Sequence, residues 1–279
     1  MSKKILPSKE SKLSPRQTSI LFAMVKEYCN SGKSIGSKEL QEKYGFECSS
    51  ATIRNELVAL RKSGFLYQPF TNSSSRPTEK AYKIFINQLI LGLQATHRQQ
   101  QKLKQQILEL EENQFKLNKE LSRLLAGNTG GVGFAVDERS EDYAGIANLV
   151  NQPSEGRVVD ILDFLDNLDN HKQHLLSSYK KDHLQAIDSK SSLQAYVGQE
   201  NPILPLGKGY AMILAKIEPK DSQKSVVGLI APPHLLARKK NLELVDAISK
   251  IFQPDKKAKK NSKPSSKSSI KPSNDQSIA

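Results

Sequence analysis

The chain has 279 residues, with 42 Lys and Arg against 29 Asp and Glu, and only two cysteines. That length suits about two domains. Two cysteines are too few for a disulfide framework, no apolar run approaches the ~20 residues that span a bilayer, and the N-terminus lacks a signal-peptide core. We therefore expect a cytoplasmic, nucleoid-associated protein with no membrane partner.

The positive charge lies at the two ends of the chain. Residues 1–90 hold 15 basic and 7 acidic residues, a surplus of 8, and residues 91–254 hold 20 of each. From residue 255 onward there are 7 Lys against 2 Asp, a surplus of 5. Localised positive charge is what neutralisation of DNA phosphates requires. Residues 1–12 and the Lys/Ser-rich residues 254–279 are predicted to be disordered.

Residues 13–84 carry the pattern of a winged helix-turn-helix DNA-binding domain. Ser14-Pro15 begins a helix whose apolar residues recur at helical spacing as far as Tyr28. A short helix is predicted over 37–44, and after a turn at Gly45 a third helix begins at Ser49 or Ser50. Helix, tight turn and helix, followed by a strand from Gly64 and a polar loop over 71–78, predict this domain.

The third helix carries the candidate DNA contacts. Its apolar residues Ile53, Leu57 and Leu60 fall on one side and define the buried face. Arg and Asn can pair with guanine and adenine edges, while Ser and Thr suit phosphates or bases. An ordinary solvated helix face is the alternative. The predicted DNA-binding residues are Ser49, Ser50, Thr52, Arg54, Asn55, Arg61 and, from the loop, Arg76.

A heptad repeat follows over residues 85–126. Apolar residues step by three and four through this segment, which is typical of a coiled coil that dimerises. The alternative is a helix that packs against the rest of its own chain. The predicted dimerisation residues are Ile86, Leu89, Leu93, Leu103, Ile107, Leu110, Leu117, Leu121 and Leu124.

The remaining residues predict a mixed domain. Residues 127–142 are rich in glycine without a P-loop or dinucleotide motif, and are interpreted as a linker. Beyond it, over 143–253, the pattern predicts helices over 158–168 and 171–187, strands over 193–197, 210–217 and 226–230, and a closing helix over 235–252. The predicted fold class is therefore α+β.

No pattern of catalytic or metal-binding residues stands out. His171, His174 and His183 have no cysteine or acidic partners at ligand spacing and are interpreted as solvated. No nucleophile–base pair is present in a recognisable motif. We expect no enzyme activity, no cofactor and no metal.

Several motifs resemble the HrcA family of bacterial heat-inducible transcription repressors. They include Ile35-Gly-Ser-Lys-Glu-Leu40, Ala51-Thr-Ile-Arg-Asn55 and Pro77-Thr-Glu-Lys-Ala-Tyr82, with weaker similarity at Asp142–Leu149 and Val227–Pro232. The chain departs from the family at Phe70, where His is usual, and at Ser74 and Ser75, where the family has Gly and Arg.

The resemblance implies a repressor of chaperone genes that binds an inverted-repeat operator as a homodimer and is released on heat stress. It also implies a GAF-like C-terminal domain, here shortened by loss of a dimerisation insert, and the chaperonin GroEL as a partner. Two other functions remain open: a ligand-responsive winged-helix regulator unrelated to heat shock, and a low-specificity nucleic-acid-binding structural protein.

Overall fold

A computed structural model describes residues 13–70, 73–93, 116–152, 156–177, 193–200, 209–219 and 225–252, together with the single residues 101, 103, 105 and 154. The predictions of disorder over 1–12 and 254–279 lie outside these residues. So do Ile107 and Leu110 of the heptad repeat.

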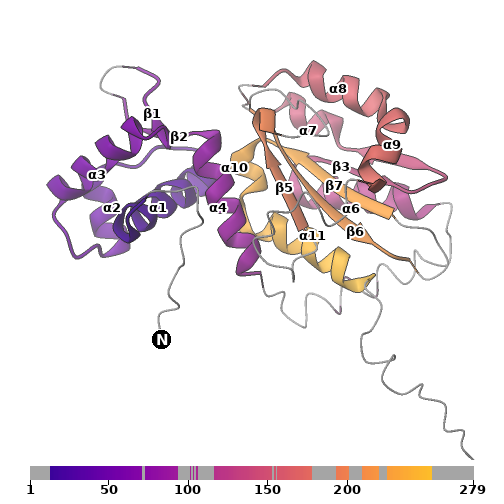
Figure 1. Ribbon diagram of the computed structural model, residues 1–279, viewed down its shortest axis with the longest axis horizontal. Helices are drawn as coiled ribbons and strands as arrows, with labels where there is room; N and C mark the ends of the chain where they lie inside the picture. The colour runs from indigo at the N-terminus through magenta and orange to yellow at the C-terminus, as the bar shows by residue number, and fades with distance from the viewer. Residues whose placement is uncertain are drawn as a thin grey trace, which may run out of the picture.

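Three helices and a small hairpin form the N-terminal part, residues 13–78, which we call the three-helix unit (Figure 1). They are α1 (Pro15–Ser31), α2 (Ser37–Tyr44) and α3 (Ser50–Lys62), then the antiparallel strands β1 (Leu66–Tyr67) and β2 (Arg76–Pro77). Ser14 caps α1 in a capping box with Gln17. Gly32 and Gly45 end α1 and α2 in the left-handed conformation, which glycine adopts at little cost.

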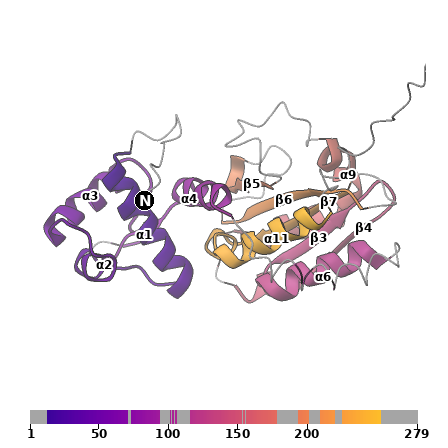
Figure 2. The same ribbon diagram turned by 90° about the horizontal axis from the view of Figure 1, so that it is seen from below.

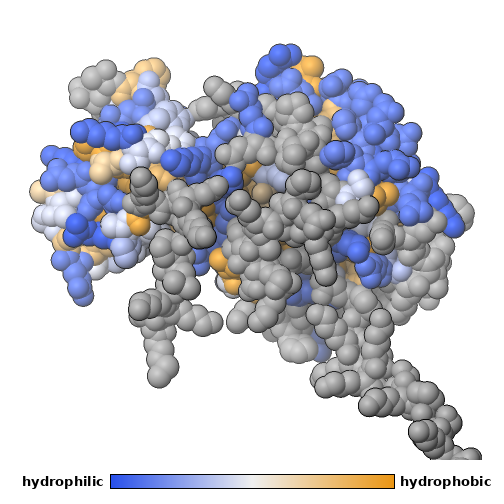
Figure 3. Space-filling model, viewed as in Figure 1, coloured by the Kyte–Doolittle hydropathy of each residue, from blue (hydrophilic) through white to orange (hydrophobic). Residues whose placement is uncertain are grey.

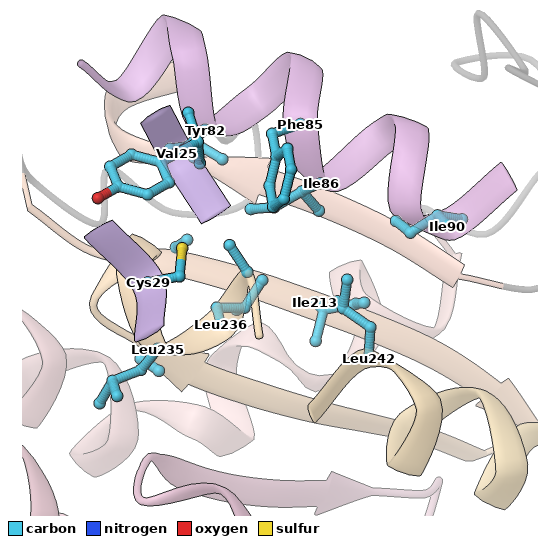
Figure 4. Close-up of a cluster of buried hydrophobic side chains, with 14 of the residues drawn as sticks. Val25, Cys29, Tyr82, Phe85, Ile86, Ile90, Ile213, Leu235, Leu236 and Leu242 are labelled. Carbon is cyan, nitrogen blue, oxygen red and sulfur yellow. The ribbon is translucent and has the colours of Figure 1, made fainter. Parts of the chain in front are cut away.

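Helix α4 (Glu79–Leu91) lies between the three-helix unit and the rest of the chain (Figures 1 and 2). Its Phe85 ring meets Phe22 of α1 edge to face, with ring centroids 5.4 Å apart. Other side chains of the helix, among them Ile86 and Ile90, face Leu236, Ile213 and Leu242 of the C-terminal part (Figure 4). A single apolar core, which we call the shared core, therefore runs from the three-helix unit through α4 into the C-terminal part.

The C-terminal part is built on a five-stranded antiparallel sheet in the order β4-β3-β7-β6-β5. Its strands are β3 (Val132–Val136), β4 (Glu141–Ala144), β5 (Leu193–Val197), β6 (Ala211–Ile217) and β7 (Ser225–Ala231). A 3-10 turn, η2 (Gly198–Glu200), follows β5. The predicted α+β class is confirmed, and the three predicted strands agree with β5, β6 and β7 to within one residue at each end.

Helices cover both faces of this sheet, and we call the whole the C-terminal sandwich (Figure 2). On one face lie α6 (Leu117–Thr129), α10 (Pro233–Leu236) and α11 (Lys239–Ile251). On the other lie α7 (Ile146–Val150), α8 (Val158–Asp166) and α9 (Leu168–Ser177).

Alternation along the strands produces two cores. In β6, Ile213 and Ala215 face the shared core, while Met212 and Leu214 face a second core under α7–α9. Because successive side chains of a strand point to opposite faces, a strand with apolar residues at every position is buried on both sides. This accounts for the continuous apolar runs of β6 and β7.

The linker predicted over 127–142 is wrong, because these residues hold the end of α6, all of β3 and the start of β4. Their glycines serve close packing. Gly130 ends α6 at a φ of 73°. A Cβ at Gly133 would collide with the carbonyl of Ser122, so α6 lies closer to β3 than any side chain at that position would allow.

The single helix predicted over 85–126 is also not what the described residues form. Helix α4 ends at Leu91 with Gly92 as its C-cap, and α6 begins at Leu117. Ile86 and Leu121 are fully buried, Leu103 and Leu117 nearly so, and Leu89, Leu93 and Leu124 pack against the same core. The four buried residues are covered by their own chain, which corrects their prediction as dimerisation residues, whereas Leu89, Leu93 and Leu124 are only half-buried. Apolar residues spaced by three and four suit either a second copy or the same chain.

Candidate nucleic-acid interface

Helix α3 presents a polar face to solvent. Ile53, Leu57 and Leu60 are buried beneath it, and the opposite side carries the exposed residues Arg54, Asn55 and Lys62. Positions three and four apart share a helix face, so the buried residues determine which side chains are free. Arg54 and Asn55, both predicted from the sequence, are therefore available to a ligand laid along α3.

The N-terminus of α3 is ordered by its own side chains. Ser49 is the N-cap, and its Oγ accepts a hydrogen bond from the backbone N–H of Thr52 at 3.1 Å. The two hydroxyls lie 2.9 Å apart. Ser49 is exposed, whereas Ser50 and Thr52 are half-buried. Uncompensated N–H groups at a helix start favour an anion such as phosphate, so these three predicted residues lie where a phosphate contact is expected.

Arg61 has a different environment from the other predicted contacts. Its guanidinium donates to Ser75 Oγ at 2.9 Å, and Ser75 is only 5% exposed. The bond joins the last turn of α3 to the hairpin residue that directly precedes β2. Arg61 is therefore a link between two parts of the surface, a role that the sequence pattern did not indicate.

Side-chain hydrogen bonds join the two arms of the hairpin near its tip. At its tip Ser73 Oγ donates to the Phe70 carbonyl at 2.7 Å, and Gln68 Nε2 donates to the Ser73 carbonyl at 2.6 Å. Arg76 lies on β2, paired in register with Tyr67, and is exposed. Phe70 is 77% exposed, the most exposed of the large apolar side chains described.

Two of the unit's carboxylates are turned inward. Glu56 of α3 accepts from Arg16 at 2.7 Å and from Gln17 at 3.0 Å, both on α1. Glu27 of α1 accepts from Tyr44 at 2.7 Å and from Lys43 of α2 at 2.5 Å. These bonds fasten the three helices together and keep both negative charges away from the exposed side of α3. Hydrophilic side chains are spread over the face of the unit seen in Figure 3, with smaller apolar areas between them.

Lys62 is a further candidate for contact with a ligand, beyond the residues predicted from the sequence. It is exposed in the last turn of α3, on the same side as Asn55. Its position in the helix, seven residues after Asn55 and so two turns on, was a usable signal. A cation there extends the positive character of the face toward the hairpin.

Other kinds of site are not seen in the described part of the chain. Among those residues no group of three or more His, Cys, Asp or Glu side chains could hold a metal ion. Nor does any helix within them have the length and apolar content to cross a membrane. Burial raises the pKa of the Cys29 thiol to about 12, so it stays protonated at neutral pH.

The architecture defines a class: a three-helix unit with a hairpin, joined through α4 to an α/β sandwich. Residues 71–235, more than half of the chain, match the family described as HrcA protein C terminal domain. The chain therefore belongs to the HrcA family.

Curated relatives carry the name heat-inducible transcription repressor HrcA. One from Synechococcus elongatus is 37% identical over 121 residues, which are 43% of this chain and 34% of the relative. One from Leptospira biflexa is 38% identical over 117 residues, 41% of this chain and 33% of the relative. The matched segments thus span about a third of the length of these relatives.

A solved structure shares the fold. The crystal structure of a hypothetical protein at 2.2 Å resolution has a TM-score of 0.59 and 17% sequence identity, and the match covers 86% of this chain and 98% of that one. At this identity the likeness concerns the fold alone.

Proposed function

We propose that the chain is a sequence-specific DNA-binding repressor of heat-shock genes, and that the three-helix unit is a winged helix-turn-helix. The observation that carries the proposal is the polar face of α3, on which Arg54, Asn55 and Lys62 are exposed to solvent. The hairpin lies beside this face and is hydrogen-bonded to α3 through Arg61. In this class a helix of that kind lies in the major groove and reads base edges. The names of the curated relatives support repression as the outcome of binding.

In this proposal the protein acts as a homodimer on an inverted repeat, because two symmetric copies present two α3 helices to two half-sites. We place the dimer contact in the C-terminal sandwich, which we take to be a GAF-like domain, because the described heptad residues pack against their own chain. Sedimentation equilibrium at micromolar concentration tests this step, and a monomer in the presence of operator DNA would contradict it.

The central test is competition binding. DNA selected from a random pool by the wild-type protein is measured against bulk duplex at fixed salt. A sequence-specific repressor prefers its site by about 10³-fold or more. Equal affinity for any duplex would instead indicate a low-specificity nucleic-acid-binding protein and would overturn the proposal.

Release on heat stress is a separate step. We propose, from the resemblance to the family, that chaperone operons are the targets and that the chaperonin GroEL is the partner that favours the DNA-binding form. Genome-wide DNA occupancy before and after a temperature shift tests it. Occupancy that leaves chaperone promoters after the shift supports the proposal, whereas sites unrelated to chaperone genes and unchanged by heat would contradict it.

A further inference from the structure

One carboxylate of α4 reaches across to the C-terminal sandwich. Glu79 is the first residue of α4, directly after the hairpin strand β2 and the N-cap Thr78. Its Oε1 accepts a hydrogen bond from the backbone N–H of Gly209 at 2.9 Å, across 130 residues of sequence. A hydrogen bond to a charged acceptor is about twice as strong as one between neutral groups.

Two glycines shape the place that this carboxylate occupies. Gly198 and Gly209 have φ angles of 63° and 91°, in a region that residues other than glycine adopt only with strain. A Cβ at Gly198 would overlap the Glu79 carboxylate. Gly198 N–H also donates to the Tyr210 carbonyl at 2.8 Å, which ties the end of β5 to the start of β6. The absence of a side chain at Gly198 therefore leaves the space that the Glu79 carboxylate occupies.

The residues next to Glu79 connect this contact to the DNA-facing surface. Thr78 Oγ1 donates to the Gly64 carbonyl at 2.8 Å, just beyond the end of α3. The Thr78 N–H donates to the Phe65 carbonyl at 3.0 Å, at the start of the hairpin. Together with the Arg61–Ser75 bond, these contacts make the end of α3, the hairpin and the start of α4 one bonded piece. Through the Glu79 carboxylate, that piece makes a polar contact with the sandwich.

We propose that Glu79 is a positioning residue, which fixes the direction in which α3 and the hairpin face relative to the C-terminal sandwich. The inference rests on the proposed function, because direction matters where two copies must match two half-sites. In a dimer held by the sandwiches, the angle of each three-helix unit sets the distance between the two α3 helices. Glu79 thereby determines which half-site spacing is bound, while Arg54 and Asn55 determine which bases are read.

The first experiment selects DNA from a random pool with the wild-type protein, Glu79→Ala, Glu79→Gln and the control Glu42→Ala. Glu42 is an exposed acid of α2, so its substitution removes the same charge. We expect Glu79→Ala to keep the half-site bases but to accept a broader range of spacings. Glu79→Gln, whose amide oxygen can still accept from Gly209, should keep most of the wild-type preference. A spacing distribution for Glu79→Ala that equals the wild type would overturn the inference.

The second experiment needs no DNA and so separates this inference from the proposed function. Gly198→Ala is made in the wild type and in Glu79→Ala, and hydrogen exchange of the hairpin and β5 is measured. Because the added Cβ strikes the carboxylate, Gly198→Ala should speed exchange of these segments about tenfold more in the wild type than in Glu79→Ala. Equal effects in both backgrounds show that the carboxylate does not couple the two parts. If DNA selection fails for every variant while this coupling is present, the proposed function is wrong and the positioning contact stands.

Discussion

At the scale of single residues, the exposed side chains of α3 separate recognition from folding. Arg54 and Asn55 are exposed, so Arg54→Ala and Asn55→Ala should change stability by less than about 0.5 kcal/mol. Each should weaken operator binding by about 1–3 kcal/mol, and relax preference at one base pair of the half-site. Fluorescence anisotropy with selected and scrambled duplexes measures this. Lys240→Ala, an exposed cation of α11, is the matched control; equal losses for all three would contradict base reading by α3.

Glu27 is a residue whose charge serves the fold. It is 7% exposed, and burial alone raises the pKa of its carboxyl, but the hydrogen bonds from Lys43 and Tyr44 outweigh burial and the net pKa is lowered. A carboxyl with a lowered folded pKa contributes stability above its unfolded pKa, and that contribution is lost as the pH falls through the folded value.

Glu27→Gln should therefore destabilise the protein at pH 7, by about 1–3 kcal/mol. The difference between Glu27→Gln and wild type should shrink as the pH falls below the ordinary range of a glutamate carboxyl. Urea denaturation at pH 7, 5 and 3.5 measures it, with the exposed Glu42→Gln as control. A difference that is the same at all three pH values would show that the charge of Glu27 does not stabilise the helices.

At the scale of elements, the hairpin depends on Arg61 for its attachment to α3. Arg61→Ala leaves the nearly buried Ser75 hydroxyl without its guanidinium partner, a loss of about 1–3 kcal/mol for a bond to a charged group. We expect faster hydrogen exchange confined to the hairpin and weaker DNA binding without a change of preferred bases. Arg61→Lys restores the charge but not the planar fork and should recover only part of the exchange protection. Loss of preference at one base pair would instead make Arg61 a direct base contact.

Elements that rest on local signals were predicted well from the sequence. Caps at Ser14 and Ser49 and the left-handed glycines gave α1 to α3, and β-rich runs gave β5 to β7. Two elements were not predictable locally. In 127–142 the glycines suggested a linker. Their role depends on the folded arrangement, since Gly133 allows the close approach of α6 to β3 and Gly131 the close approach to the distant strand β7. The apolar spacing of 85–126 likewise fits a coiled coil or a helix buried by its own chain. Ile86 and Leu121 lie on two separate helices, α4 and α6, and both are buried by their own chain.

The candidate site was predicted to a similar extent. Arg54, Asn55 and Arg76 are exposed as a ligand-facing role requires, and helical spacing alone places them opposite Ile53 and Leu60. Arg61 was assigned to the same group because its spacing also permits exposure. Its bond to Ser75 depends on the path of the hairpin 14 residues later. The spacing of apolar residues in α3 carries no information about that path.

At the scale of the whole molecule, the shared core joins the two parts, so we expect them to unfold as one cooperative body. Val25 and Cys29 of α1, Ile86 of α4 and Leu236 of α10 lie in one cluster (Figure 4). Around it, Arg238 Nε donates to the Cys29 carbonyl at 3.1 Å, and the rings of Tyr28 and His234 meet at 90°. Opening the three-helix unit therefore exposes apolar surface of the sandwich as well.

Ile86→Ala tests that cooperativity. Ile86 is fully buried at the junction, and truncation of such a residue costs about 2–5 kcal/mol, from lost transfer energy and the cavity left behind. If the shared core joins both parts, hydrogen exchange by global opening should quicken equally in α1 and in β6. The control Val159→Ala, at a side chain 59% exposed on α8, should leave both unchanged. Quicker exchange in α1 with β6 unaffected would mean that the three-helix unit opens alone, and that α4 is a joint between independent bodies rather than part of a common core.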